Sequence, residues 1–116
     1  MGINVTYAPK IEGYDTTCLH NHGAAAGLAP EHVLTELRPA LAQRLDQAST
    51  DFEGLLKDWL KHADGFGQMV EAGPLTDRVQ GVFEGLAEDG GLILRLPDGE
   101  RRTIRAGDVD LVRQVD

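Results

Sequence analysis

The sequence predicts an α+β fold, in which a short N-terminal strand and loop precede two helices and a small five-stranded antiparallel β-barrel. Three observations lead to this prediction. Leucines recur at helical spacing in the middle of the chain. From Gln68 onward the apolar residues change to a period of two, which is typical of strands. Short turn sequences rich in glycine and aspartate separate these segments.

The first residues, Met1 to Tyr7, alternate apolar and polar side chains and have the composition of a strand. A strand at this end needs neighbours for its backbone, and the next β-rich segment begins only at Gln68. Residues 8–29 are predicted to form a loop, because prolines and glycines interrupt any regular pattern.

A first helix is predicted from Pro30, a residue that suits the first helical position because it lacks an N–H. Its apolar face is formed by Val33, Leu34, Leu37, Leu41 and Leu45. Pro39 lies inside this pattern and cannot donate the usual hydrogen bond, so we expect a kink or a break there.

A second helix is predicted to begin at Thr50, which forms a capping box with Glu53. The helix should end before Gly65 and Gly67. Its apolar stripe comprises Phe52, Leu55, Leu56, Trp59 and Leu60. The place of Trp59 in this stripe favours a role in core packing over one as a ligand platform.

Five strands are predicted at residues 68–71, 78–85, 91–96, 101–105 and 109–113. The turns between the last four are Glu88-Asp89-Gly90-Gly91, Pro97-Asp98-Gly99 and Ala106-Gly107-Asp108. Asp98-Gly99 is a strong hairpin signal. Five short strands with tight turns in under 50 residues indicate an SH3-like antiparallel barrel. We place a domain boundary between residues 66 and 67, so that residues 67–116 form the barrel.

The chain of 116 residues carries a formal net charge of −8, and neither half is basic, so no footprint for nucleic acid or an anionic membrane is expected. No apolar run approaches the roughly 20 residues of a membrane span, and no signal peptide is recognisable. Cys18 is the only cysteine, which excludes an internal disulfide. A cytoplasmic location is expected.

Three groups of residues could carry chemistry, and each has a simpler explanation. Four histidines (His20, His22, His32 and His62) lack the spacing of a structural zinc site, so we expect no metal. Cys18 has no recognisable base and orienting partner, so a buried small residue is favoured over a nucleophile. The basic segment 101–105 either contacts an anion or protects an edge strand, and the second explanation is favoured.

Several segments, in the same order, resemble bacterial biotin protein ligases. Gly2-Ile3-Asn4-Val5 is similar to the end of that family's Gly-Ile-Gly-Ile-Asn-Val strand, and Tyr14-Asp15-Thr16-Thr17-Cys18-Leu19 is similar to its Tyr-Pro-Ala-Thr-Ser-Leu segment. Trp59-Leu60 matches the helix that closes the catalytic domain. The strongest likeness is to the C-terminal barrel, over Gly81 to Leu94, Asp98-Gly99 and Ala106 to Val109.

The resemblance implies an enzyme that uses biotin, ATP and Mg²⁺ to make biotinyl-5′-AMP and then biotinylates a lysine of a carboxylase carrier protein. Gly2 and Asn4 would line the biotin and nucleotide pocket. Asp108 and Arg113 would contact the nucleotide, although Val112 stands between Leu111 and Arg113 where the family has no residue, which on a strand changes the face. No catalytic residue is assigned.

The family's Gly-Arg-Gly-Arg loop and Lys-Trp-Pro-Asn strand do not occur in this sequence. We therefore expect residues 1–66 to be a C-terminal remnant of a ligase catalytic domain, inactive without an N-terminal ligase half. The alternative is a free-standing SH3-like module that docks on a protein partner or a separate ligase half. A purely structural domain is a third possibility. Without the N-terminal ligase half, the leucine face of residues 33–45 would be exposed in the isolated chain. We therefore expect self-association or a loosely ordered N-terminal third.

Overall fold

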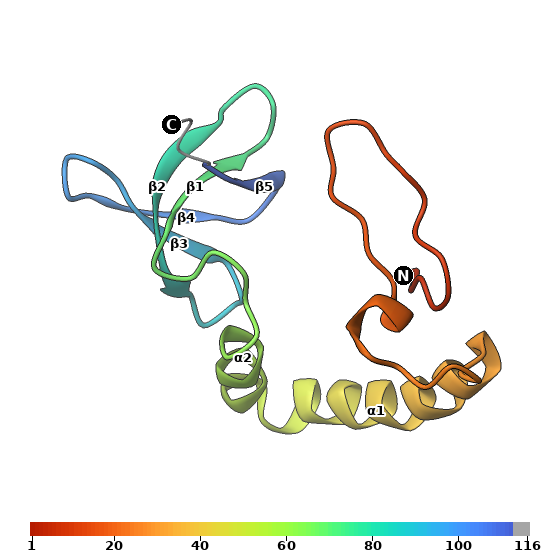
Figure 1. Cartoon of the computed structure of the whole chain (residues 1–116). Helices are drawn as coiled ribbons and strands as arrows, with labels where there is room; N and C mark the ends of the chain where they lie inside the picture. Colours follow the sequence, from red (N-terminus) through yellow and green to blue (C-terminus); the bar gives the residue numbers. More distant parts are fainter. Residues whose placement is uncertain (113–116) are drawn as a thin grey trace. The chain divides into compact units, whose positions relative to one another are not determined.

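The computed structural model describes residues 1–112 and contains two compact units, Met1–Asp46 and Gln47–Asp116, each of which is described here by itself (Figure 1). The first unit holds a long N-terminal coil, a short 3₁₀ helix η1 (Leu19–His22) and most of helix α1 (Pro30–Thr50). The second holds helix α2 (Phe52–Leu60) and a five-stranded antiparallel sheet.

The predicted strand at Met1–Tyr7 is wrong, because these residues are coil. Their backbone is instead satisfied by the start of η1: the N–H of Leu19 donates to the carbonyl of Asn4, and that of His20 donates to the carbonyl of Val5, each at 3.0 Å. Val5 and Cys18 are the buried side chains of this unit. A single short segment with no strand beside it cannot form the ladder that defines a sheet.

Helix α1 continues through Pro39, so the predicted break is not formed. A proline removes one intrahelical hydrogen bond, and the helix tolerates that loss. The apolar face remains largely uncovered, since Leu34, Leu41 and Leu45 are 54%, 46% and 63% exposed.

Helix α2 begins one residue later than the predicted capping box. Asp51 is its N-cap, and the Asp51 carboxylate accepts a hydrogen bond from the Gly54 N–H at 3.0 Å. Glu53 pairs with Lys57 at 2.7 Å instead of closing the box. A carboxylate at this position satisfies a free amide and also faces the positive end of the helix dipole, which explains why Asp51 replaces Thr50 as the cap.

The strands are β1 (Met69–Gly73), β2 (Val79–Leu86), β3 (Leu92–Arg95), β4 (Arg101–Ile104) and β5 (Asp108–Leu111). Their boundaries lie within two residues of the predicted ones, except that residue 113 of the last predicted strand lies outside the described residues. The strand order is β4-β3-β2-β1-β5, with every neighbouring pair antiparallel. The α+β class with a five-stranded antiparallel module is confirmed.

The core of the sheet consists of Val70, Ala72, Phe83 and Leu94, against which Leu60 of α2 packs. A register shift between Phe83 and Gly85 marks a bulge in β2, a device that bends a strand and strengthens its twist. The sheet stays open, because no ladder joins β4 to β5 among the described residues. The predicted boundary at residue 66/67 remains a prediction; the compact unit that holds the sheet also includes α2.

Candidate functional site

The turn Ala106-Gly107-Asp108 leads into edge strand β5, and its backbone packs against Gly73 at the end of β1. Gly73 pairs with Asp108 in the ladder, and both Gly73 and Gly107 have positive φ angles, of 116° and 93°. A Cβ atom added to Gly107 would overlap the backbone of Gly73 and the nitrogen of Pro74. Only glycine permits this approach, so the turn that presents Asp108 has a fixed position relative to β1.

An open, mainly apolar cavity of about 840 Å³ lies between α2 and the open side of the sheet. Its wall includes Leu55, Leu56 and Trp59 of α2, Phe83 of β2, and Val109 and Leu111 of β5. The Trp59 ring lies 6.3 Å from that of Phe83, yet the residue is 52% exposed. Trp59 therefore packs on the core, as its place in the apolar stripe suggests, and also presents a face to the cavity.

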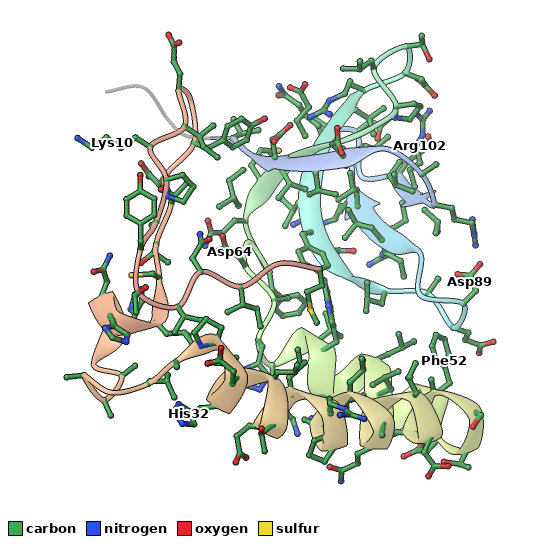
Figure 2. All side chains as sticks on the ribbon, turned by 90° about the vertical axis from the view of Figure 1, so that its right-hand side faces the viewer. Lys10, His32, Phe52, Asp64, Asp89 and Arg102 are labelled. Carbon is green, nitrogen blue, oxygen red and sulfur yellow. The ribbon has the colours of Figure 1, made fainter. Side chains whose placement is uncertain are left out.

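The rim of the cavity is polar at the β2–β3 turn. In Figure 2, Phe52 of α2 lies near the turn that carries Asp89, and a Cβ at Gly90 would be 3.7 Å from the Phe52 ring. Arg105 donates to Asp89 at 2.6 Å, and the N–H of Gly91 donates to the same carboxylate at 3.0 Å. These two donors, chiefly Arg105, hold the pKa of Asp89 below its ordinary value.

The other perturbed carboxylates of the sheet are held ionised in the same way. Hydrogen bonds from Arg95 and Arg101 lower the pKa of Glu84, and those from Gln80 and Arg78 lower the pKa of Glu71. A general acid needs a raised pKa, which is the opposite direction. The arrangement suits binding and positioning better than proton transfer.

The structure locates three of the four predicted site residues. Gly2 and Asn4 lie in the N-terminal coil, where the Asn4 side-chain amide donates to the carbonyl of Thr17 at 3.1 Å. This bond brings the Gly-Ile-Asn-Val segment to the Tyr-Asp-Thr-Thr-Cys-Leu segment. Asp108 begins β5 and is exposed. Arg113 lies outside the described residues. The roles of all four remain predictions.

The histidines, Cys18 and the basic segment 101–105 were also candidates for chemistry, and the structure shows the surroundings of several of them. His22 pairs with the Thr17 hydroxyl at 2.9 Å, and Cys18 is 4% exposed. Within residues 1–112, no three histidine, cysteine, aspartate or glutamate side chains gather where they could hold a metal ion. Arg101 and Arg105 form ion pairs with Glu84 and Asp89, so both arginines have carboxylate partners within the second unit.

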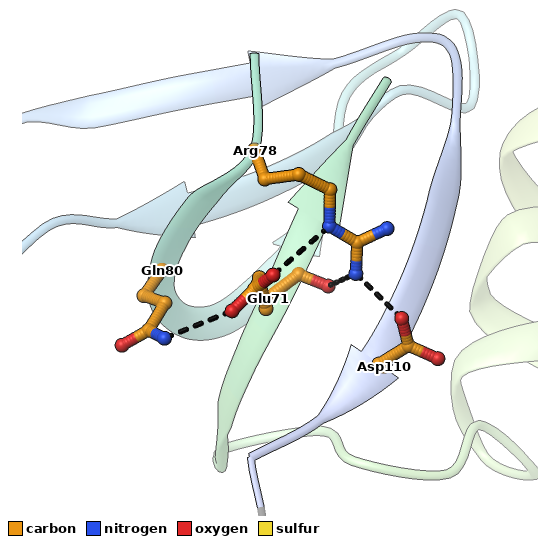
Figure 3. Close-up of polar contacts among 4 residues, drawn as sticks. All are labelled: Glu71, Arg78, Gln80 and Asp110. Carbon is orange, nitrogen blue, oxygen red and sulfur yellow. Dashed lines mark hydrogen bonds and ion pairs between the residues drawn. The ribbon is translucent and has the colours of Figure 1, made fainter. Parts of the chain in front are cut away.

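No sequence pattern singles out Arg78, which lies just before β2 and contacts both β1 and β5 (Figure 3). Its only local signal is an opposite charge, Glu71, across the β1–β2 turn. The second partner of Arg78, Asp110, is 32 residues away, and nothing in the local pattern indicates that pairing.

An open antiparallel sheet of five short strands, with a helix beside it and a glycine-fixed turn before the last strand, places the second unit among SH3-like β domains. Residues 65–112 match the family model of the biotin protein ligase C-terminal domain. Residues 65–112 are therefore similar to the C-terminal domain of biotin protein ligases, and the resemblance inferred from the sequence is confirmed for that part.

The chain is also 33% identical over 114 residues to the biotin–[acetyl-CoA-carboxylase] ligase of Paracoccus denitrificans. The match covers 94% of this chain and 47% of that ligase, so the chain spans about half the length of this curated relative. None of the helices in the described part of the chain has both the length and the apolar content that a membrane span requires.

Proposed function

We propose that this chain acts as the C-terminal part of a biotin protein ligase, in the cytoplasm. The observation that carries the proposal is the match of residues 65–112 to the C-terminal domain of that family, in a chain whose upstream segments follow the same ligase order. The Ala106-Gly107-Asp108 turn, which is part of the family signature in the sequence, is also the turn whose position is fixed by a backbone contact.

The proposed reaction has two steps. A carboxylate oxygen of biotin attacks the α-phosphorus of ATP, so that a P–O bond forms, the bond to the β-phosphate bridging oxygen breaks, and pyrophosphate leaves. The amine of a lysine on a biotin carboxyl carrier protein domain then attacks the carbonyl carbon of biotinyl-5′-AMP. An amide C–N bond forms, the C–O bond to the phosphate breaks, and AMP and a proton are released.

Four residues of this chain have proposed roles in that reaction. Gly2 and Asn4 line the pocket for biotin and the nucleotide, Asp108 contacts the nucleotide from the barrel, and Arg113 is the arginine that accompanies Asp108. The hydrogen bond from Asn4 to Thr17 and the fixed turn before Asp108 support these placements. No metal-binding role is assigned to these four residues.

The proposal includes that these 116 residues alone are inactive. The first step must hold two anions, biotin and ATP, close together, which needs cationic donors, and in the family those donors lie in the Gly-Arg-Gly-Arg loop and the Lys-Trp-Pro-Asn strand. Neither segment occurs in this sequence. The proposed partners are therefore an N-terminal ligase half and the carrier protein.

Joining the N-terminal half of the Paracoccus ligase to Gly2 of this chain tests the proposal. We expect the joined protein to catalyse biotin-dependent exchange of pyrophosphate into ATP, and the 116 residues alone to show none. Asp108→Asn should raise the KM for ATP, whereas Asp98→Asn, in the neighbouring hairpin turn, should leave it unchanged. A joined protein that folds and binds no ATP would contradict the proposal and favour the free-standing interaction module, which a pull-down with a separate ligase half would then test.

A further inference from the structure

Strand β5 is an edge strand, and among residues 1–112 its only ladder partner is β1. All four of its residues are exposed. Its attachment to the sheet therefore depends on the ladder with β1, on the close backbone packing of Gly107 against Gly73, and on side-chain contacts across the sheet face. Asp108, the proposed nucleotide contact, is the first residue of this weakly covered strand.

The ladder places like charges opposite each other. Glu71 of β1 pairs in register with Asp110 of β5 on one side and with Gln80 of β2 on the other, so the three side chains form a row on one face. Asp108 shares that face of β5 because it is two residues from Asp110. Carboxylates directly opposite on neighbouring strands repel each other and weaken the pairing.

Arg78 compensates this repulsion. Its Nε donates to a Glu71 carboxylate oxygen at 3.1 Å, and one terminal nitrogen donates to the Glu71 backbone carbonyl at 3.3 Å and to the Asp110 carboxylate at 2.5 Å (Figure 3). The Arg78 side chain is 17% exposed, whereas the side chains of Glu71 and Asp110 are 37% and 63% exposed, so solvent partly screens these contacts. The Gln80 side-chain amide donates to the second Glu71 carboxylate oxygen at 2.9 Å, which holds this carboxylate in position to accept from Arg78.

We propose that Arg78 is a positioning residue, which bridges the opposed carboxylates Glu71 and Asp110 and thereby holds β5, with Asp108 at its start, against β1. The functional consequence rests on the proposed function, in which Asp108 contacts the nucleotide. The positioning itself rests only on the contacts within the sheet.

Residue-resolved amide hydrogen exchange of the 116-residue chain tests the positioning without any nucleotide. In Arg78→Gln, the β5 amides and the Val112 N–H, which donates to the Met69 carbonyl at 3.2 Å, should exchange about three- to tenfold faster relative to the β2–β3 amides. Arg78→Lys should recover part of the protection. The matched control Arg95→Gln, which breaks an arginine–glutamate pair between β3 and β2, should leave β5 unchanged.

The pH profile separates bridging from a general structural role. The groups facing Glu71 are Arg78 and Gln80 from the β2 side and Asp110 from β5, with Asp108 on the same face. Gln80, then Arg78, lower the pKa of Glu71, so the bridge is intact at neutral pH and is lost as the pH falls through that lowered pKa. After correction for intrinsic rates, β5 protection should therefore fall with falling pH in the native chain. In Arg78→Gln it should rise, because protonation relieves the repulsion.

The same pH trend in the native chain and in Arg78→Gln, or faster exchange spread evenly over all strands in Arg78→Gln, would overturn the inference. The double variant Glu71→Gln/Arg78→Gln removes one of the opposed charges and should restore β5 protection toward the native level; no recovery would also count against it. Failure of the proposed nucleotide role of Asp108 can be distinguished from failure of the positioning by Arg78. If Asp108→Asn leaves the KM for ATP of the joined protein unchanged while the exchange results hold, the nucleotide role fails and the positioning by Arg78 stands.

Discussion

Replacing Gly107 with alanine tests whether the turn before β5 is fixed by its contact with β1. The backbone of Gly107 has φ of 93°, where a residue with a Cβ is disfavoured by about 1–2 kcal/mol. The added Cβ would also overlap the backbone of Gly73, which cannot move as the end of a flexible side chain can. Overpacking of this kind costs about 1–3 kcal/mol, so we expect Gly107→Ala to lower the free energy of unfolding by about 2–5 kcal/mol in total.

The matched control is Gly99→Ala. Gly99 has a nearly equal φ of 89°, but apart from its two chain neighbours no residue in the described part of the chain has an atom within 4 Å of the position that its Cβ would occupy. Its replacement should therefore cost only the backbone term, about 1–2 kcal/mol. The difference between the two variants isolates the overlap with Gly73.

Urea unfolding followed by Trp59 fluorescence provides the measurement, since Trp59 contacts the core residue Phe83. With a slope of about 1 kcal/mol per molar for a small domain, Gly107→Ala should lower the unfolding midpoint by about 2 M or more, and Gly99→Ala by about 1–2 M. Equal midpoints for the two variants would refute the reasoning, because the contact between Gly107 and Gly73 would then contribute nothing.

Three further predictions concern the second unit. Asp51→Ala removes the cap of α2 and should lower the unfolding free energy by about 1 kcal/mol in urea titrations, and no loss would mean that the carboxylate does not cap the helix. Leu94→Ala should cost about 2–5 kcal/mol because Leu94 is fully buried, whereas Leu75→Ala, at an 89% exposed position, should change the unfolding free energy by less than about 0.5 kcal/mol in the same titrations. Because Arg105 lowers the pKa of Asp89, their pair should stabilise the fold at neutral pH and lose this effect as the pH falls through the lowered pKa. Arg105→Gln should remove that part of the acid dependence in pH-dependent thermal unfolding, and an unchanged acid limb would contradict the pairing.

The sequence predicts the sheet well because its signals are local. The period of two from Gln68 onward and the turn glycines Gly90, Gly99 and Gly107, all with positive φ, act within a few residues of where they stand. Strand boundaries consequently agree within two residues in the described part of the chain.

Local rules fail where a distant or competing group decides. The alternation at Met1–Tyr7 resembles a strand, but the described residues supply it with no strand to pair with, so its carbonyls accept from η1 instead. Asp51 displaces Thr50 as a cap because two acceptors compete for one helix end. Arg78 could not be assigned because Asp110 reaches it only through the pairing of β1 with β5, which a linear pattern does not encode.

Transfer of biotin to a carrier protein is the most direct test of the central claim that this chain completes a biotin protein ligase. The joined protein, with the N-terminal half of the Paracoccus ligase before Gly2, is incubated with biotin, ATP, Mg²⁺ and a carrier domain, and the intact mass of the carrier is measured. The account predicts the gain of one biotinyl group, lost when the acceptor lysine is replaced by arginine, and no gain with the 116 residues alone. Biotinylation by the 116 residues alone, or none by a folded joined protein under conditions where the intact Paracoccus ligase is active, would contradict it.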